Sequence, residues 1–414
     1  MADRPYDRPY DIVLFGATGF TGGLTAEYLA RVAGPELRWA LAGRDRARLE
    51  AVRERIGLPG LPLLLADVTD PASMAEIARQ ARVVATTVGP YLTYGEPLVA
   101  ACADAGTHYA DLTGEAEFVD RMFIRHHERA RRTGAKLVHA CGFDSIPHDL
   151  GAYFTVGHLP EGVPLEVDGF VRASGAASGG TVHSAVLAAS RLREAGEAAR
   201  VRKELEGVPE PRLVAGPAAD RAVDPAPPPA ARRVRGGPGT VRYVGGWALP
   251  LPTLDPQVVA RSARALERYG PDFTYRHHFA IKSLPAALGL AAGVGTLALL
   301  AQVPPARSLL LKRFPQGAGP TPEHRARNWF KVTFLGRGGG ARVVTEVAGG
   351  DPGYTETARM LGEAALCLAS DDLPDVSGQV TTAVAMGDAL IGRLRRAGIT
   401  FRVLSDSRGQ APGR

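Results

Sequence analysis

The stretch VLFGATGFTGGLTAEYL, residues 13–29, decides the fold of the first part of the chain. A short apolar run ends at Phe15 and is followed by Gly16, Gly19 and Gly22. Between a strand and a helix, the first glycine allows a tight turn, the second lets the backbone approach a pyrophosphate, and the third lets the helix pack closely on the sheet. The first amides of the helix then face the phosphates. The motif predicts that a dinucleotide contacts Gly16, Thr18, Gly19, Phe20 and Gly22; a glycine-rich turn without a ligand is the alternative.

Around this turn, residues 1–150 alternate short β-branched runs with longer helical patterns, which is typical of a parallel sheet with crossover helices. Strands are predicted at 11–15, 39–42, 63–66, 83–86, 108–112 and 136–139, and helices at 21–33, 45–56, 71–78, 96–105 and 115–133. Six strands in this rhythm predict a Rossmann-type, dinucleotide-binding domain over residues 1–150.

The pattern changes after residue 150, and residues 151–354 are predicted to form a second domain that contains both strands and helices. Its expected elements are a strand at 165–174, a helix at 181–205, a proline-rich loop at 207–238, and a hairpin formed by 329–335 and 341–347. In residues 355–414, helices at 355–369 and 381–397 and a strand at 400–404 are expected to pack back on the first domain. The predicted fold class is α/β: a Rossmann-type parallel sheet, a second mixed α+β domain and a returning C-terminal segment.

Length and composition exclude several classes of protein. At 414 residues the chain exceeds what one hydrophobic core fills, which predicts at least two domains. The net charge is +6, but arginines alternate with acids along helical patterns, and no nucleic-acid-binding module is recognisable. Cys102, Cys141 and Cys367 lie too far apart to indicate disulfides or a zinc site, and the N-terminus is too polar for a signal peptide. We therefore expect a cytoplasmic protein with no metal and no nucleic-acid partner.

One segment, Leu284–Ala301, has eighteen residues without a charge and is flanked by Lys282 and Arg307. Three interpretations remain open. In the first, the segment is a core helix or a buried helical hairpin of the second domain. In the second, it is a helix that docks peripherally on a membrane, on an acyl chain or on a partner. In the third, it is a transmembrane span. Its many alanines and glycines make it weakly hydrophobic for a span, and the buried helix is the preferred interpretation.

The residue after the second predicted strand selects the cofactor. A carboxylate there would bind the ribose hydroxyls of NAD, whereas Arg44 offers a cation for a 2′-phosphate, so NADPH is predicted. If Asp45 rather than Arg44 faced the ribose, this preference would invert. Asp67 and Val68, after the third strand, are placed beside the adenine, although Asp67 is equally suited to cap the helix that follows.

Polar residues gather where the next three strands end. Thr87 and Gly89 follow the fourth strand, where the nicotinamide half of the cofactor should lie, and Tyr94 follows in the same loop. The runs YADLTGE (109–115) and HACGFDSIPHDLG (139–151) end the fifth and sixth strands and bring Asp144 and His148 to the same crevice. Each residue alone has a structural alternative, because aspartates cap helices and histidines bond to backbone groups.

Four motifs together resemble the saccharopine dehydrogenase-like oxidoreductases: GATGFTG (16–22), TTVGPYLTYGEPLV (86–99), YADLTGE and CGFDSIPHDLG (141–151). The chain as a whole resembles their actinobacterial branch, the trans-acting enoyl reductases, because SGGT (178–181), YGPDFTY (269–275), GGDPGY (349–354) and AMGDALIGRLRRAGITF (385–401) follow in the same order. The resemblance covers nearly the whole chain. It departs at Thr382 and Ala383, where a proline-containing turn is expected, and in the proline-rich loop.

The resemblance implies NADPH-dependent reduction of a carbon–carbon double bond in a polyketide or lipid acyl chain that a synthase supplies in trans during glycolipid assembly. It also implies association with the inner face of the plasma membrane. The resemblance implies that residues 151–354 form a mixed α+β domain for substrate binding and dimerisation. The expected partners are a carrier-bound acyl substrate, a polyketide synthase and, in a homodimer, a second copy of the chain. Hydride would reach the β-carbon of an enoyl thioester and a proton its α-carbon. Tyr94, Asp144 and His148 are the candidates for the acid or its orienting partner, and Thr181 and Ser184 for binding the substrate carbonyl.

Two other functions remain open. An amino-acid oxidoreductase that acts at a C–N bond, as the name of the parent family implies, would need a basic pocket for substrate carboxylates, and the second domain offers only scattered arginines. A non-catalytic scaffold that binds NADPH at a lipid surface would keep its role after Tyr94, Asp144 and His148 are replaced.

Overall fold

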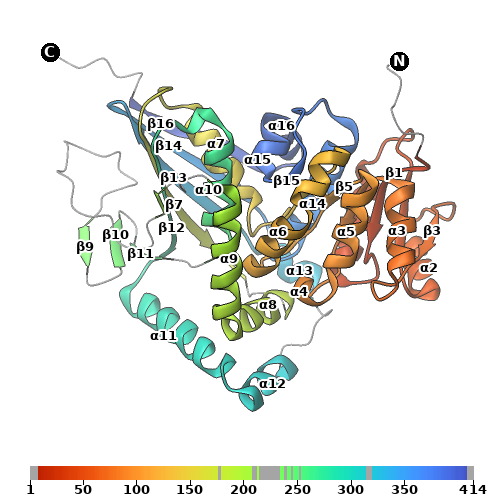
Figure 1. The fold of residues 1–414 in the computed structure, drawn as a ribbon. Helices are drawn as coiled ribbons and strands as arrows, with labels where there is room; N and C mark the ends of the chain where they lie inside the picture. The colour runs from red at the N-terminus through yellow and green to blue at the C-terminus, as the bar shows by residue number, and fades with distance from the viewer. Residues whose placement is uncertain are drawn as a thin grey trace.

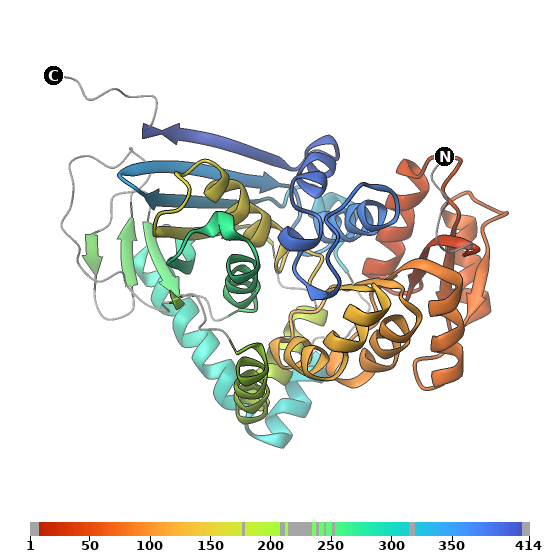
Figure 2. The ribbon, with the colours of Figure 1, turned by 45° about the horizontal axis from the view of Figure 1, so that its top comes forward.

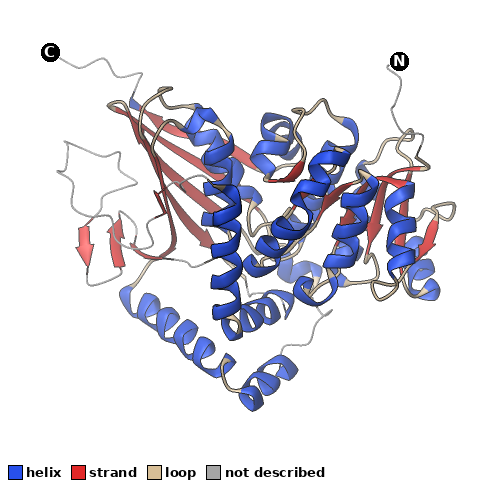
Figure 3. Ribbon diagram, in the orientation of Figure 1, coloured by secondary structure: helices blue, strands red, loops and turns tan. Residues whose placement is uncertain are grey.

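The computed structural model describes residues 8–175, 179–207, 212–213, 234–236, 240–243, 246–250, 253–313 and 319–407. Within these residues the chain forms two β-sheets with helices between and around them (Figures 1 and 3). Sheet A lies at the right of Figure 1 and is built mainly by the N-terminal part of the chain, whereas sheet B lies at the left. Most of the predicted proline-rich loop at 207–238 lies outside the described residues.

Sheet A has seven parallel strands in the order β15-β6-β5-β4-β1-β2-β3. Six of them confirm the predicted strands, and their order is that of a doubly wound dinucleotide-binding sheet. The seventh strand, β15, comes from the C-terminal segment, which therefore returns to the first sheet. The strands are β1 (Tyr10–Phe15), β2 (Trp39–Gly43), β3 (Leu63–Leu65), β4 (Ala81–Thr86), β5 (His108–Ala110), β6 (Lys136–Val138) and β15 (Gly378–Val380).

Helices cover both faces of sheet A: α1 (Phe20–Val32), α2 (Arg46–Arg55), α3 (Pro71–Gln80), α5 (Glu96–Ala105), α6 (Ala116–Thr133) and α14 (Thr355–Ser370). The short helix α4 (Tyr91–Tyr94) packs on α5 and α6, and α7 (Ile146–Gly157) packs on sheet B. In β1, Ile12 and Leu14 belong to a core shared with α1 and α14, whereas Val13 and Phe15 belong to a second core with α3 and α5. Because both faces are buried, the strands are continuous apolar runs rather than alternating ones.

Sheet B is mixed, with strand order β16-β14-β13-β7-β12-β11-β10-β9 and with β8 paired to β12. β12 runs parallel to β7 and to β8, and the other neighbours are antiparallel. β13 and β14 form the predicted hairpin. The strands are β7 (Leu165–Ala173), β8 (Arg212–Leu213), β9 (Val234–Gly236), β10 (Thr240–Tyr243), β11 (Gly246–Pro250), β12 (Phe273–Ile281), β13 (Phe330–Gly338), β14 (Ala341–Gly349) and β16 (Thr400–Asp406).

The prediction for the last strand was wrong in its location. β16, expected on the first domain, pairs antiparallel with β14 at the edge of sheet B (Figure 2). Phe401 of β16 is buried beside sheet B, where its ring packs edge-on against Phe154 of α7. Of the C-terminal segment, α14 and β15 pack on or extend sheet A, so this segment joins both sheets.

Two predicted helices are each divided in the structure. The segment 181–205 forms α8 (Gly179–Ser190) and α9 (Leu192–Glu206), because Arg191 leaves the helical conformation with φ −128° and ψ 32°. The Arg191 guanidinium donates two hydrogen bonds to Glu117 of α6. The segment 381–397 forms α15 (Thr382–Ala385) and α16 (Gly387–Arg396), which are separated at Met386. The other helices are α10 (Asp255–Ala265), the 3-10 helix η1 (Glu267–Tyr269), α11 (Leu284–Ala301), α12 (Pro304–Arg313) and α13 (Pro322–Arg325).

The interpretation of Leu284–Ala301 as a buried core helix was wrong. The segment is a single helix, α11, of which only 11% is buried, with Leu288 and Leu299 57% and 72% exposed. Together with α12 it lies along one side of the molecule, where it contacts α8 and β11 (Figures 1 and 2). By length and composition, α11 is also able to cross a membrane.

Candidate cofactor and active site

The glycine turn after β1 has the geometry of an anion cradle. Gly16 has a φ of +91°, and a Cβ there would lie 2.7 Å from Val88 Cγ2. A Cβ at Gly22 would lie 2.2 Å from the Gly16 carbonyl oxygen, so a glycine is needed for α1 to begin this close to β1. Gly19, by contrast, is exposed and is the N-cap of α1 without a side-chain cap. The first amides of α1 are therefore open to an anion, which fits a dinucleotide pyrophosphate.

The structure gives Arg44 and Asp45 different roles. Asp45 is the N-cap of α2, and its carboxylate accepts a hydrogen bond from the Arg48 amide at 3.1 Å. Arg44, directly after β2, is exposed. Asp45 is thus engaged by its own helix, whereas the Arg44 guanidinium is accessible at the position where a 2′-phosphate is expected.

Asp67 does not cap α3. The N-cap of α3 is Asp70, which accepts from the Ala72 amide at 3.0 Å. Asp67 instead accepts hydrogen bonds from the amide and hydroxyl of Thr69, and these bonds, aided by the charge of Arg44, lower the pKa of Asp67. Val68 is half-buried against the sheet. The loop after β3 therefore presents Asp67 and Val68 near Arg44, as an adenine-ribose site requires.

The carboxyl end of β4 borders the glycine turn. The Thr87 hydroxyl donates to the Gly16 carbonyl oxygen at 3.0 Å, and Gly89 is exposed in the loop that follows. Thr18 and Phe20, the two neighbours of Gly19 in the glycine turn, are half-buried. The predicted cofactor-binding residues of these two loops thus lie together in the fold.

A cation that the sequence pattern did not reveal lies beside the same turn. The Arg325 guanidinium of α13 lies over the Phe20 ring, with 5.6 Å from Cζ to the ring centroid, and donates to the Thr355 hydroxyl at 3.0 Å. Its Nε has no hydrogen-bond partner among the described residues. Phe20 also packs edge-on against Tyr354, with 4.9 Å between ring centroids. Arg325 is therefore a further candidate to bind a cofactor phosphate. It lies beside the glycine turn only because of the tertiary packing of α13.

Ser184 is engaged by the first domain. The buried Glu115 carboxylate accepts from the amides of Tyr91 and Leu92, at 3.1 and 2.8 Å, and from the Ser184 hydroxyl at 3.0 Å. Burial raises the pKa of Glu115. These contacts join α8 to the loop that carries Tyr94, so Ser184 positions the site rather than offering an uncommitted hydroxyl. The backbone of Thr181 lies in α8, and its side chain is outside the described part of the chain.

A second buried network holds the loops after β5 and β6 together. The Asp111 carboxylate accepts from the Tyr109 hydroxyl at 3.0 Å and the Ala140 amide at 2.8 Å, and it lies 2.6 Å from His139 Nδ1. All three of these side-chain groups are buried. Asp111 and His139 therefore fix the backbone that leads to Asp144.

Asp144 is the accessible carboxyl at the ends of β5 and β6. Water reaches it, but the protein packed around it raises its pKa to about 6. A Cβ built on Gly114 would lie 3.3 Å from Asp144 Oδ2, which places the carboxyl against the β5 loop. Tyr94 of α4 is 40% exposed, in the loop that Glu115 ties to the same region. Both groups have the accessibility that a proton donor to a substrate needs.

His148, the third predicted catalytic residue, lies deeper in the protein. It is 2% exposed, and its ring packs edge-on against Phe143 and His277, with centroid distances of 5.5 and 4.8 Å. Burial lowers the pKa of His148 to about 3. An imidazole that stays uncharged at neutral pH does not suit the role of proton donor.

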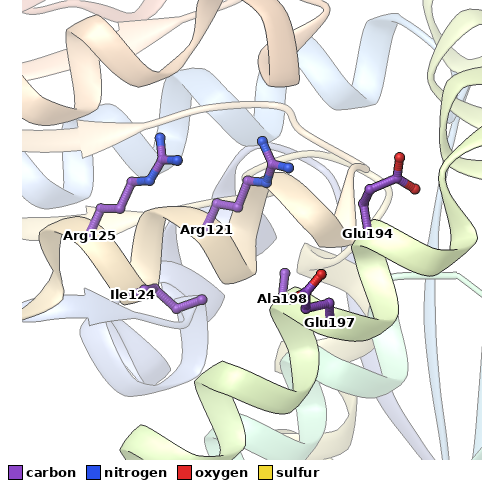
Figure 4. Close-up of a pocket in the computed structure, with 6 residues that line it drawn as sticks. All are labelled: Arg121, Ile124, Arg125, Glu194, Glu197 and Ala198. Carbon is purple, nitrogen blue, oxygen red and sulfur yellow. The ribbon is translucent and has the colours of Figure 1, made fainter.

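A cavity of about 230 Å³ lies between α6 and α9, apart from the predicted site residues (Figure 4). Ile124 and Ala198 line its apolar part, and charged side chains form the rest of its wall. Its six lining residues are Arg121, Ile124, Arg125, Glu194, Glu197 and Ala198. With two arginines on the α6 side and two glutamates on the α9 side, the cavity offers no selective site for an anionic cofactor.

Replacing Gly19 by alanine should weaken NADPH binding by at least about 30-fold without lowering stability, because the new Cβ would occupy space needed by the pyrophosphate. Within the protein that Cβ would meet only the Gly16 carbonyl oxygen, at 3.5 Å. Gly22→Ala should instead destabilise the fold. Calorimetric titration and thermal unfolding measure the two effects, with Gly34→Ala, whose Cβ would meet nothing within 4 Å, as the control. Equal NADPH affinity of the Gly19 and Gly34 variants would contradict the assignment.

Comparisons with known proteins agree with this geometry. Residues 12–138 match the family model of the saccharopine dehydrogenase NADP binding domain. The protein named trans-acting enoyl reductase in Mycobacterium tuberculosis H37Rv is 38% identical to this chain, and the alignment covers 96% of this chain and 98% of that protein. The protein of the same name in Mycobacterium ulcerans is 37% identical, and the alignment covers 95% of this chain and 97% of that protein. The solved apo saccharopine dehydrogenase (L-Glu forming) of Saccharomyces cerevisiae has the same fold, with a TM-score of 0.54 at 12% identity over 95% of this chain and 99% of that one. The chain therefore belongs to the trans-acting enoyl reductase family, as an NADP-dependent oxidoreductase with a saccharopine dehydrogenase-like fold.

Proposed function

We propose that this protein reduces the carbon–carbon double bond of an enoyl thioester, in a polyketide or lipid acyl chain that a separate synthase supplies, during lipid or glycolipid biosynthesis. The near-complete alignment with relatives named trans-acting enoyl reductase carries the proposal. The cofactor cradle and the accessible Asp144 at the adjoining strand ends supply what the reaction needs.

In this proposal one group of residues binds the cofactor and another residue transfers the proton. Gly16, Gly19 and Gly22 let the backbone of α1 hold the pyrophosphate, and Arg44 binds the 2′-phosphate. When bound, NADPH supplies the hydride that is added to the β-carbon. Asp144, in its protonated form, donates a proton to the α-carbon and is then reprotonated from water.

Two further residues act around this proton transfer. The Tyr94 hydroxyl stabilises the oxyanion that develops on the thioester carbonyl. Ser184, through its bond to Glu115, fixes the loop that carries Tyr94. We assign Thr181, at the start of α8, to the substrate side of the same site.

Stopped-flow oxidation of NADPH with a panel of enoyl thioesters tests the reaction. We expect turnover with at least one enoyl acceptor, and products two hydrogens heavier by mass spectrometry. The panel also contains saccharopine and other amino acids with NADP⁺, which test the alternative oxidation at a C–N bond. NADPH that binds but is not consumed by any enoyl acceptor would contradict the proposal, and reduction of NADP⁺ by an amino acid would favour the alternative.

We also propose that the protein is cytoplasmic and docks on the inner face of the plasma membrane through α11, where it meets its synthase partner. The exposed apolar surface of α11, with a mean hydropathy of 1.9, supports this location. Lys282 precedes the helix and Arg307 follows it, so cations flank the apolar surface. Such a surface suits an anionic lipid interface. The contacts of α11 with α8 and β11 favour a helix that lies on the bilayer over one that spans it.

Replacing Leu288 and Leu299 together by aspartate should lower binding to anionic phospholipid vesicles by at least about 10-fold, because each buried leucine contributes more than about 1 kcal/mol. Vesicle flotation measures the bound fraction. Leu192→Asp is the matched control, since Leu192 is 66% exposed on a different helix, α9. Wild-type protein that stays with the unbound fraction, or a double variant that floats as well as the control, would contradict membrane docking through α11.

A further inference from the structure

Two histidines and an aspartate form a buried cluster where α7 and α10 pack on each other and on sheet B. His148 comes from α7, which follows strand β6 of sheet A, Asp255 is the first residue of α10, and His277 lies in β12 of sheet B. One ligand atom of each lies within 4.8 Å of the other two, and no residue of the three is more than 5% exposed. Segments that are distant in the sequence thus bring three metal-binding side chains together.

The cluster contains polar atoms that the protein itself does not satisfy. Asp255 Oδ1 lies 3.7 Å from His148 Nε2, and Asp255 Oδ2 lies 3.6 Å from His277 Nε2, both too long for hydrogen bonds. Among the described residues, Asp255 Oδ1, His277 Nε2 and His148 Nδ1 have no hydrogen-bond partner. Buried polar atoms are nearly always paired, so this cluster indicates a partner that is not a protein atom.

We propose that His148, Asp255 and His277 bind one divalent transition-metal ion of the zinc class. Two imidazole nitrogens and one carboxylate oxygen form a donor set that such ions take in proteins. In a tetrahedral site with bonds of about 2.1 Å the donor atoms lie about 3.4 Å apart. The donor atoms of these three residues lie within 4.8 Å of one another, so the side chains move closer together when the ion binds. Three protein ligands leave a fourth position for water.

A neighbouring hydroxyl group orients one of the proposed ligands. The Tyr275 hydroxyl lies 3.0 Å from His277 Nδ1, so it orients the ring and leaves Nε2 toward Asp255. Gly169 makes room for this hydroxyl, since a Cβ there would lie 2.8 Å from it.

A bound ion would join α7 to α10 and β12. Its role is to hold sheet B against the loop that carries Asp144, so it extends beyond the proposed reductase activity and does not depend on it. The sequence pattern led us to expect no metal, because it was judged from cysteine spacing alone. His148, Asp255 and His277 come from elements whose contact only the fold creates.

Metal retention by the full-length protein tests the site. Chelator-treated protein is loaded with Zn²⁺, passed through a desalting column and analysed by mass spectrometry of the metal, and about one equivalent should remain. The double variant His148→Gln with His277→Gln should retain less than about a tenth of an equivalent. His278→Gln is the matched control: this buried neighbour stacks on Phe170 and should leave retention unchanged.

Loading with Co²⁺ gives a readout that does not depend on the variants folding. Tetrahedral Co²⁺ in the wild-type protein should show intense visible absorption, which free Co²⁺ lacks. Wild-type protein that retains no Zn²⁺ and leaves the Co²⁺ spectrum unchanged would overturn the proposal, as would equal retention by the double variant. Because neither measurement uses NADPH or an enoyl substrate, failure of the metal site is distinguishable from failure of the proposed reductase function.

Discussion

Replacing Asp144 by asparagine should lower kcat for enoyl reduction by about 100- to 1,000-fold, because asparagine keeps the shape of the side chain but has no acidic proton to donate. The Kd for NADPH should stay within about twofold of the wild-type value, since Asp144 is assigned to the substrate and not to the cradle. Stopped-flow kinetics and calorimetric titration measure the two quantities separately. Asp104→Asn, at an exposed ion pair with Arg129, is the matched control.

The pH profile adds a readout that a purely structural role would not change. The protein packed around Asp144 raises the pKa of its carboxyl to about 6, so the carboxyl is protonated below that pH and ionised above it. A donor acts in its protonated form, and kcat/KM should therefore be highest below about pH 6 and fall as the pH rises. The asparagine variant should lose this decline. A variant with wild-type kcat, or with the same pH dependence, would show that the proton comes from another group, with Tyr94 the next candidate.

The elements that could be predicted from the sequence are those whose pattern is local. The glycine turn and the six strands of the first domain are set by short-range features: a tight turn, apolar runs and intervening amphipathic helices. The breaks at Arg191 and Met386 depend instead on tertiary context. Arg191 interrupts a helical pattern to reach Glu117, a residue from the other domain that no sequence window contains. Three-residue β15 is likewise recognisable only through its pairing with β6.

In the candidate site, too, some residues are placed by local sequence and others by tertiary packing. Gly16, Gly19 and Arg44 are close in sequence to the elements that position them, so spacing alone was enough to propose roles for them. Arg325 reaches the cradle from another domain, and nothing in its own segment marks it. For His148, too, the sequence could not show the surroundings: burial by distant segments lowers the pKa of its imidazole, which argues against a role as proton donor. Function that depends on burial or on a partner from another domain is set by tertiary packing.

A buried ion pair between Arg202 and Asp120 joins α9 to α6, and we expect it to contribute strongly to stability. Arg202 of α9 and Asp120 of α6 are each about 2% exposed and lie 2.6 Å apart, and Arg202 also pairs with Glu206 at 2.5 Å. Replacing Arg202 by methionine should lower the free energy of unfolding by about 3–5 kcal/mol, because Asp120 would remain buried without the arginine that contacts it. The matched control is Arg200→Met, which removes an ion pair with Glu204 in which both side chains are 61% exposed. That change should cost less than about 0.5 kcal/mol.

Guanidinium unfolding followed by circular dichroism measures both variants. A second substitution, Asp120→Asn in the Arg202→Met background, should recover part of the loss, since it removes the unpaired buried charge. Gln257, which donates to Asp120, remains able to bond to the amide oxygen that replaces the carboxylate. If Arg202→Met and Arg200→Met destabilise equally, the contact between α6 and α9 is held by apolar packing and not by this pair. If only the buried substitution is costly and the double variant recovers, the charge pair itself holds α9 against the cofactor-binding domain.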